Sequence, residues 1–390
     1  MSALSLVSPS ARPISGGEGF DERLAAALAF CGEHAEAADR EGMFPEAELA
    51  MLAAAGALAA PLPERSGGRG LGTEAGGSAL LLDLLEQVGA ASLPVARLIE
   101  GHINALQLIH LFGSAEQQQR YAGEVRERRL RFAVWDTDAE DGLALEPDRA
   151  GYRLSGAKTL ASGAGSIERP LVTARLPDGR PQMCIVEADT AACVVDQDGW
   201  QVSGMRASAS YRIAFDGVRI TPEALIGGPG DHHRQPWLTG GAVRFAAAQF
   251  GSAAALFEHC RAHLRRTQRG GDAHQKSRLG EMAIALETGS LWLARAAAFL
   301  DLSLSPGAEA ASARIITQAN MTRAVVERVC LHVLELVERS IGLKGFLRPH
   351  PVERIGRDLR ICLRQPAPDA ALVEAGRFAF EQGRLGSAAR

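Results

Sequence analysis

A single stretch of this chain reads as β structure, and it lies between two blocks of helical pattern. Within 132–220, short runs alternate apolar and polar residues, and turn sequences such as Asp198-Gly199 separate them. Short alternating runs bounded by such turns are typical of an antiparallel barrel or sandwich. On both sides the sequence is rich in Ala and Leu at helical spacing. A small β module between two helical blocks is an uncommon order, and it restricts the possible folds more than any single motif does.

Composition places the chain among ordinary globular proteins. Apolar residues make up 46% and charged residues 23%, and the formal net charge is -4. No cluster of Lys and Arg stands out, so neither nucleic acid nor a membrane surface is an expected partner. The 6 cysteines form no CxxC pair, which fits reduced thiols and offers no zinc site. We find no signal-peptide core and no apolar run of membrane-span length, and we therefore expect a cytoplasmic protein.

The pattern divides the chain into four segments. We predict a disordered lead-in at 1–20, a helical domain at 21–130, a central β domain at 131–234 and a helical bundle at 235–390. Three or four long helices in sequence are typical of an up-and-down bundle. The expected helices are two within 21–59, then 78–89, 102–112, 115–128, 240–266, 274–302 and 309–337, with two shorter ones after residue 349.

Two features suggest binding but have simpler interpretations. The loop at 61–72 has several glycines that could cradle a phosphate, yet its spacing matches no phosphate-binding fingerprint and no strand precedes it. We interpret it as a connector. His102 and His110 are two helical turns apart, whereas a metal-binding pair more often has a spacing of about four residues with acidic neighbours. Both are therefore predicted to be packing or surface histidines, and no metal site is expected.

Several short motifs, each weak alone, occur in the order and spacing that are usual in the acyl-CoA dehydrogenase family. The chain resembles that family over nearly its whole length. The resemblance implies an α+β multidomain fold: an N-terminal helical domain, a small central β-barrel or sandwich, and a C-terminal domain like a four-helix bundle. The motifs are FP at 44–45, PERSGGRGL at 63–71, FGSAEQ at 112–117, YRLSGAKT at 152–159, FDGVRI at 215–220 and VERIGRD at 352–358.

The resemblance implies FAD as cofactor, held by two strand ends. At the second, Ser162 falls where a hydroxyl usually meets the flavin N5 region, and a small donor suits an atom that gains a proton and electron density on reduction. Leu160 replaces the aromatic residue usually stacked there. The alternative is that Ser162 is only a turn residue before Gly163. The residues expected at the flavin from the two strand ends are Val134, Trp135, Asp136, Leu160, Ala161 and Ser162.

In the family a neighbouring subunit binds the flavin pyrophosphate through an arginine loop and a glycine turn. The matching positions here are Arg266 in the loop at 265–270, and Gly342 and Gly345 in the turn at 341–345. Arginines and bare backbone amides suit a pyrophosphate. A solvated charge run at a helix C-terminus is the alternative. The resemblance thus implies a homodimer or homotetramer.

Arg244 matches the family arginine that approaches the thioester substrate, and it is the predicted substrate-binding residue. It lies near the start of the helix expected at 240–266. An arginine at a helix start is at the unfavourable end of the helix dipole, which indicates a specific partner. A surface salt bridge is the alternative.

The catalytic base of the family is missing from both of its usual positions. Dehydrogenation removes an α-proton while a hydride goes to N5, and the proton needs a positioned base, usually glutamate. By resemblance that base would fall at Gln365 or Pro366, or in other members at Val243, and none of these can accept the proton. Glu353 and Asp358 belong to the VERIGRD motif and are expected to be ion-paired rather than catalytic.

Three functions follow from the resemblance. The first is an FAD-dependent oxidoreductase that dehydrogenates an acyl-CoA with an unrecognised base and passes electrons to an electron-transfer flavoprotein or to O₂, in fatty acid metabolism. The second is a flavin-dependent monooxygenase on the same fold, which needs no such carboxylate. The third is a non-catalytic subunit of a hetero-oligomeric dehydrogenase, suggested by the eroded flavin motifs.

Overall fold

The computed structural model of the chain describes residues 19–188, 192–365 and 368–383. The predicted lead-in lies almost wholly outside these residues, although Phe20, at its end, is buried at the start of the first helix. The helices are α1 (Phe20–Glu41), α2 (Glu46–Ala55), α3 (Ser78–Ala91), α4 (Leu93–Phe112), α5 (Ala115–Arg128), α6 (Trp237–Arg266), α7 (Ala273–Ser303), α8 (Ser312–Ile341), α9 (Pro351–Cys362) and α10 (Pro368–Gln382), with short 3₁₀ turns that include η4 (Asp231–His233) and η5 (Gly342–Phe346).

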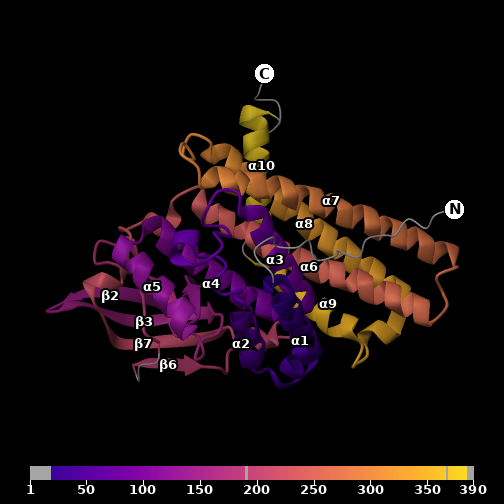
Figure 1. Cartoon of the computed structure of the whole chain (residues 1–390), viewed down its shortest axis with the longest axis horizontal. Coiled ribbons are helices and arrows are strands. Elements are labelled where there is room, and N and C mark those ends of the chain that lie inside the picture. The colour runs from indigo at the N-terminus through magenta and orange to yellow at the C-terminus, as the bar shows by residue number, and fades with distance from the viewer. Residues whose placement is uncertain (1–18, 189–191, 366–367, 384–390) are drawn as a thin grey trace.

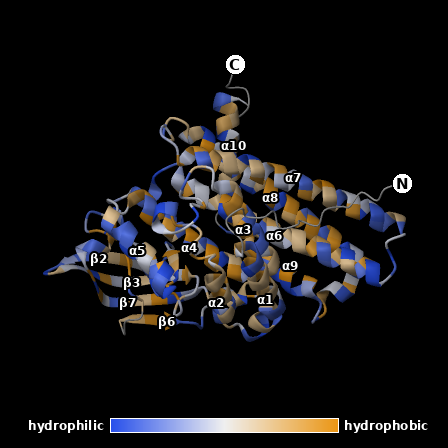
Figure 2. Ribbon diagram, in the orientation of Figure 1, coloured by the Kyte–Doolittle hydropathy of each residue, from blue (hydrophilic) through white to orange (hydrophobic). Residues whose placement is uncertain are grey.

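The molecule has the predicted α+β architecture. Figure 1 shows the sheet at one end, the long helices α6, α7 and α8 extending to the other, and the N-terminal helices between them. Helix α6 packs against α8 and α3, and α7 packs against α8. Figure 2 shows hydrophobic and hydrophilic residues alternating along α8, as expected for a helix with one buried face.

The strands form one mixed sheet. Their order is β6-β7-β3-β2-β4-β5-β8, with β1 paired to β4. Most neighbours are antiparallel, as predicted, but β1 and β2 each pair with β4 in parallel, which the alternation of side chains could not reveal. The strands are β1 (Phe132–Trp135), β2 (Asp138–Asp148), β3 (Gly151–Ala161), β4 (Arg169–Arg175), β5 (Pro181–Ile185), β6 (Cys193–Asp196), β7 (Tyr211–Ile220) and β8 (Leu225–Ile226).

Helix α4 is about twice as long as the sequence pattern predicts. It begins at Leu93 rather than at residue 102, and Pro94 occupies its first turn. Proline is tolerated there because the first amides of a helix have no intrahelical partner. The missed segment, 93–101, carries side chains that form part of the site described below.

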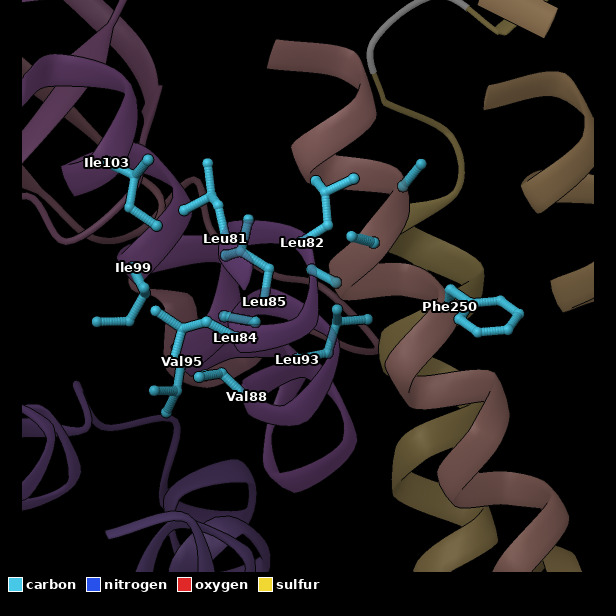
Figure 3. Packing of buried hydrophobic residues seen from close by; sticks show 14 of the residues in the cluster. Leu81, Leu82, Leu84, Leu85, Val88, Leu93, Val95, Ile99, Ile103 and Phe250 are labelled. Atoms are coloured by element: carbon cyan, nitrogen blue, oxygen red, sulfur yellow. The ribbon is translucent and has the colours of Figure 1, made fainter. Parts of the chain in front are cut away.

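The backbones of α3 and α6 approach each other at two glycines. A Cβ on Gly89 would lie 2.1 Å from the Ala248 carbonyl oxygen, and one on Gly251 would lie 1.9 Å from the Glu86 carbonyl oxygen. The crossing therefore excludes any side chain at either position. Figure 3 shows Leu82 of α3 next to α6, and Phe250 on the opposite side of α6. The contact fixes the N-terminal domain against the long-helix bundle.

His102 joins three segments of the N-terminal half. Its Nδ1 accepts from the backbone N–H of Phe132 at 3.0 Å, and its Nε2 lies 2.9 Å from the Leu58 carbonyl oxygen. Since an N–H only donates and a carbonyl only accepts, the proton of the neutral ring is on Nε2. Burial lowers the pKa of His102 to about 4, despite its bond to Leu58. The prediction of a packing histidine is confirmed.

We expect this histidine to make stability depend on pH. Its pKa is depressed in the folded chain, so wild type loses stability as pH falls from about 6.5 towards about 4, by on the order of 3 kcal/mol if nothing else titrates. His102→Gln keeps a donor and an acceptor but does not titrate. The difference in unfolding free energy between wild type and H102Q, from urea titrations across this range, should shrink as pH falls. A constant difference would contradict the assignment.

Helix α7 corrects one expectation about membrane-span length. By length and composition alone it could cross a bilayer, although only 28% of its most apolar window is buried inside the molecule. Two of its apolar side chains, Ile284 and Leu291, are both 70% exposed. They lie about two helical turns apart and so share one outward face.

Candidate active site

A cavity lies where the end of β3, the segment between β6 and β7, and helices α4, α6 and α9 meet. It has about 330 Å³ of empty space, a figure that includes space open to solvent. The lining is mostly apolar with a few polar groups. The residues that line it are Arg97, Leu160, Ser162, Trp200, Met205, Ser208, Ser210, Phe245, Ile361, Cys362 and Gln365.

Strained backbone gathers at this cavity. Leu160, Met205 and Ala209 have φ values of 51°, 58° and 46°, in the left-handed region that only glycine enters without strain. Two of them line the cavity, and the third lies between the lining residues Ser208 and Ser210. Such strain costs on the order of 1–3 kcal/mol per residue and clusters at ligand sites. Leu160 is also 40% exposed, an apolar side chain turned toward open space.

Three serine hydroxyls form a directed chain on one wall of the cavity. Ser208 Oγ donates to the Met205 carbonyl oxygen at 2.8 Å, and 2.8 Å contacts join Ser208 to Ser210 and Ser210 to Ser162. Because each hydroxyl has one proton, Ser210 must donate to Ser208, and Ser162 must donate to Ser210. Ser162 Oγ is therefore left with lone pairs only. Ser162 was predicted to be a donor at the flavin, whereas these hydrogen bonds make it an acceptor toward the cavity.

The end of β1 packs behind the end of β3, which forms part of the cavity wall. The Trp135 indole N–H donates to the Ser162 carbonyl oxygen at 3.0 Å, and the indole is fully buried. Ala161 is also fully buried, and Val134 packs against the main core. These three predicted flavin residues thus position the cavity wall without lining the cavity, while Leu160 and Ser162 line it.

Asp136 has a cationic environment of its own. Thr173 donates to its Oδ1 at 2.5 Å, and His232 Nε2 lies 3.5 Å from its Oδ2. Burial alone would raise the pKa of Asp136, but His232, Thr173 and Lys158 outweigh it and hold the pKa well below its usual range. Asp136, His232 and His233 place one possible metal-ligand atom each within 4.8 Å of one another, a grouping that sequence spacing did not indicate. The Lys158 ammonium, which donates to the Asp136 carbonyl oxygen, already supplies a cation there.

The two base positions lie in different surroundings. Gln365 lines the cavity together with Ser162, so the structure brings the predicted base position and the predicted flavin wall into one site. Val243 is buried in α6 and does not line the cavity. Pro366 lies outside the described residues. Among the described residues that line the cavity there is no carboxylate.

Arg244 is buried among side chains of α4. It is 1% exposed, its Nη2 donates to Asn104 Oδ1 at 2.7 Å and its Nη1 to Gln107 Oε1 at 2.5 Å, and its Nε lies 3.4 Å from Glu100 Oε1. Since α6 begins at Trp237, the arginine is well inside the helix rather than at its start. Its specific partners are these three side chains of α4, and it is not in a surface salt bridge. Arg244 does not line the cavity, and its substrate role stays a prediction.

Arg97 stands between Arg244 and the cavity, and sequence reasoning missed it. Its Nη1 donates to Glu100 Oε2 at 3.1 Å, and its guanidinium lies 5.0 Å from the ring centroid of Phe245. Glu100 thus bridges two arginines, one fully buried and one at the cavity. The only signal was the proline-initiated helix that contains Arg97 and Glu100.

The VERIGRD motif holds the strained segment in place. Asp358 Oδ1 accepts from the Met205 backbone N–H at 2.5 Å, and a Cβ on Gly204 would lie 2.4 Å from the Arg357 backbone. Arg357 pairs with Glu353 and with Asp39 of α1, each at 2.7 Å. Burial raises the pKa of Asp358 to about 6. Both motif acids are structural, as predicted.

The predicted pyrophosphate residues do not reach this cavity within one chain. Arg266 ends α6, and Gly342 and Gly345 lie in η5 after α8. Arg269 donates to the Ser340 carbonyl oxygen at 3.3 Å, which brings the arginine loop to the end of α8. Figure 1 shows the turn between α6 and α7 at the opposite end of the molecule from the sheet.

Comparison with known proteins defines the class of this chain. Residues 24–127 match the model of the N-terminal domain of acyl-CoA dehydrogenases, and residues 235–363 match the model of the C-terminal domain. The chain therefore belongs to the acyl-CoA dehydrogenase family, a family of flavoprotein oxidoreductases, and it has the acyl-CoA dehydrogenase fold.

Two curated relatives and one solved structure indicate the range of the family. Dibenzothiophene monooxygenase of Mycolicibacterium goodii is 23% identical over 384 residues, covering 88% of this chain and 89% of that protein. Mitochondrial isobutyryl-CoA dehydrogenase of Dictyostelium discoideum is 26% identical over 353 residues, covering 84% and 80%. FMN-bound TdsC from Paenibacillus sp. A11-2 superposes with a TM-score of 0.84 at 20% identity, covering 94% of this chain and 98% of that one.

Proposed function

We propose that this chain is a flavin-dependent monooxygenase, which binds reduced flavin at the Ser162 wall and oxygenates a small substrate in the same cavity. The observation that carries the proposal is the described cavity lining, which has Gln365 at the position of the family base and no carboxylate. An acyl-CoA dehydrogenase needs a base there. Oxygen transfer from a reduced flavin does not.

The residues present fit a flavin. The cavity is partly open to solvent, and an exposed Leu160 and the serine hydroxyls line it, which suits one face and one edge of a flat ring. When bound, reduced flavin supplies the two electrons with which O₂ gives one oxygen atom to the substrate and one to water. The serine chain presents Ser162 Oγ as an acceptor, so this wall favours a ring nitrogen that carries a proton, as N5 does in reduced flavin.

The flavin phosphate is the part for which a second copy of the chain is needed. Arg266, Gly342 and Gly345 lie far from the cavity of their own chain, so we propose that they serve the cavity of a partner copy. Leu343 and Phe346, beside these glycines, are 75% and 49% exposed, as expected at an interface. FAD, which the family resemblance implies, and FMN share the ring that the cavity would hold. We propose FMN, the form bound to TdsC, whose single phosphate would take the place of the FAD pyrophosphate at these residues.

Dehydrogenation of an acyl thioester is the second candidate. The relative named isobutyryl-CoA dehydrogenase favours it. Two buried carboxylates lie behind the cavity wall: both oxygens of Glu100 already bind arginines, and Asp358 accepts from the Met205 backbone N–H and pairs with Arg354. For this reaction the chain would need a base that does not line the cavity as described, or one from a partner chain.

Isotope-labelled O₂ tests the oxygenase proposal. Chemically reduced FMN, the protein and a panel of aromatic compounds that includes dibenzothiophene, indole and the anion naphthoate are mixed with labelled O₂, and products are read by mass spectrometry. We expect one labelled oxygen atom per product molecule and loss of transfer in Gln365→Trp, which fills the cavity. Oxidation of the flavin with no label in any member of the panel would contradict the proposal.

A further inference from the structure

The charges behind the cavity do not balance. Arg97 and Arg244 are two cations, and among the described residues the one carboxylate within ion-pair distance of either is Glu100, 3.1 Å from Arg97 and 3.4 Å from Arg244. The other oxygens that bind Arg244, from Asn104 and Gln107, are neutral. The cluster therefore carries a net charge of +1.

This excess charge is in a place where water screens it poorly. The side chains of Arg244, Glu100 and Arg97 are 1%, 5% and 19% exposed. An uncompensated charge in such surroundings is costly unless a counter-ion reaches it. Asp358, also buried in this region, is already paired with Arg354 at 3.5 Å.

Arg97 is the member of this cluster that lines the cavity, so a counter-ion bound in the cavity can reach it. Glu100 takes one donor of its planar guanidinium, and the side chain lies at the cavity surface with Phe245 against it. A guanidinium offers several donors in a fixed fork, which matches the two oxygens of a carboxylate or sulfonate. The other polar groups of the lining, three serines and Gln365, are neutral.

We infer that the substrate is a flat, apolar molecule with a single oxyanion, a carboxylate or sulfonate, bound by Arg97. The remaining lining supplies the apolar part of the site through Trp200, Phe245, Met205 and Ile361. Two of these side chains, Trp200 and Phe245, are aromatic and suit a flat apolar body. The inference rests on the proposed function only in naming this ligand as the substrate.

Binding measurements with a matched pair of probes, one anionic and one neutral, test the inferred role of Arg97. Naphthoate and the neutral naphthamide differ in charge but hardly in shape, and calorimetry measures both on the protein as purified and after saturation with FMN. We expect wild type to bind naphthoate about tenfold or more tightly than naphthamide. Arg97→Met should remove that preference and Arg97→Lys should retain part of it. Arg377→Met, an exposed arginine on α10, is the control and should keep the preference.

Three outcomes would overturn the inference: equal affinity of wild type for both probes, equal loss of both in R97M, or loss of FMN binding in R97M with the preference intact. If R97M does not fold, the inference is tested by the preference of wild type for naphthoate and by the part of that preference that R97K retains. Failure of oxygen transfer with the anion preference intact would overturn the proposed function and leave this inference in place. Absence of the preference in wild type, with oxygen transfer intact, would overturn this inference and leave the proposed function in place.

Discussion

Replacing Arg244 with alanine is expected to lower the free energy of unfolding by about 3–5 kcal/mol, because it strips partners from buried groups of α4. Asn104 and Gln107 lose their donors, and Glu100 keeps only Arg97. The effect falls on stability first and on ligand binding second, since Arg244 does not line the cavity. Urea unfolding followed by circular dichroism gives the number.

The matched control is Arg261→Ala, which lies on the same helix. Arg261 pairs with Glu258 one turn away, and the two side chains are 18% and 38% exposed. Such a pair contributes about 1 kcal/mol or less. A loss in R244A no larger than that in R261A would contradict the burial argument. If R244A folds normally but no longer binds the substrate, Arg244 has the substrate-binding role that the family resemblance implies.

Replacing Gly251 with alanine is expected to destabilise the chain by about 3 kcal/mol, at the upper end of what overpacking costs. The added methyl would overlap the Glu86 carbonyl oxygen and lie 2.9 Å from the Ala90 amide nitrogen, and backbone cannot move aside as a side chain can. Gly89, opposite, faces the Ala248 backbone in the same way. The two helices must separate, which loosens the N-terminal domain against the bundle.

Gly280→Ala provides the comparison within a helix. A Cβ at Gly280 of α7 meets nothing within 4 Å, so the change in stability on substitution depends only on the helix propensities of glycine and alanine. We expect G280A to stabilise by roughly 0.5–1 kcal/mol. Thermal unfolding of both variants measures the contrast, and equal behaviour of G251A and G280A would show that the α3–α6 crossing is not as close as described.

The order of the domains was predictable because it depends on periodicity, which is local in the sequence. The expectation that the usual base positions carry no acid also depended on single residues, and the structure brings Gln365 to Ser162. The serine chain was not predictable, because Ser208 and Ser210 come from an irregular segment that only the fold brings beside β3. Arg97 was missed because Pro94 concealed the start of α4.

Long-range charge balance is the other property that spacing could not reveal. Arg244 and Glu100 are far apart in the chain, and no local pattern indicates that one carboxylate serves two arginines. In the same way, Asp136 was predicted from the resemblance as a flavin contact, while its partner His232 lies in η4, on another segment. The flavin role of Asp136, Val134 and Trp135 stays a prediction.

An anaerobic titration of the flavin-loaded protein with acyl-CoAs of several chain lengths separates oxygenation from dehydrogenation at the cavity. A chemical reductant added last shows that the bound flavin can be reduced. Because the described lining offers no carboxylate to remove an α-proton, we predict that the visible absorption band of the flavin persists with every acyl-CoA and disappears only with the reductant. Stoichiometric bleaching by any one acyl-CoA would contradict this and establish a dehydrogenase.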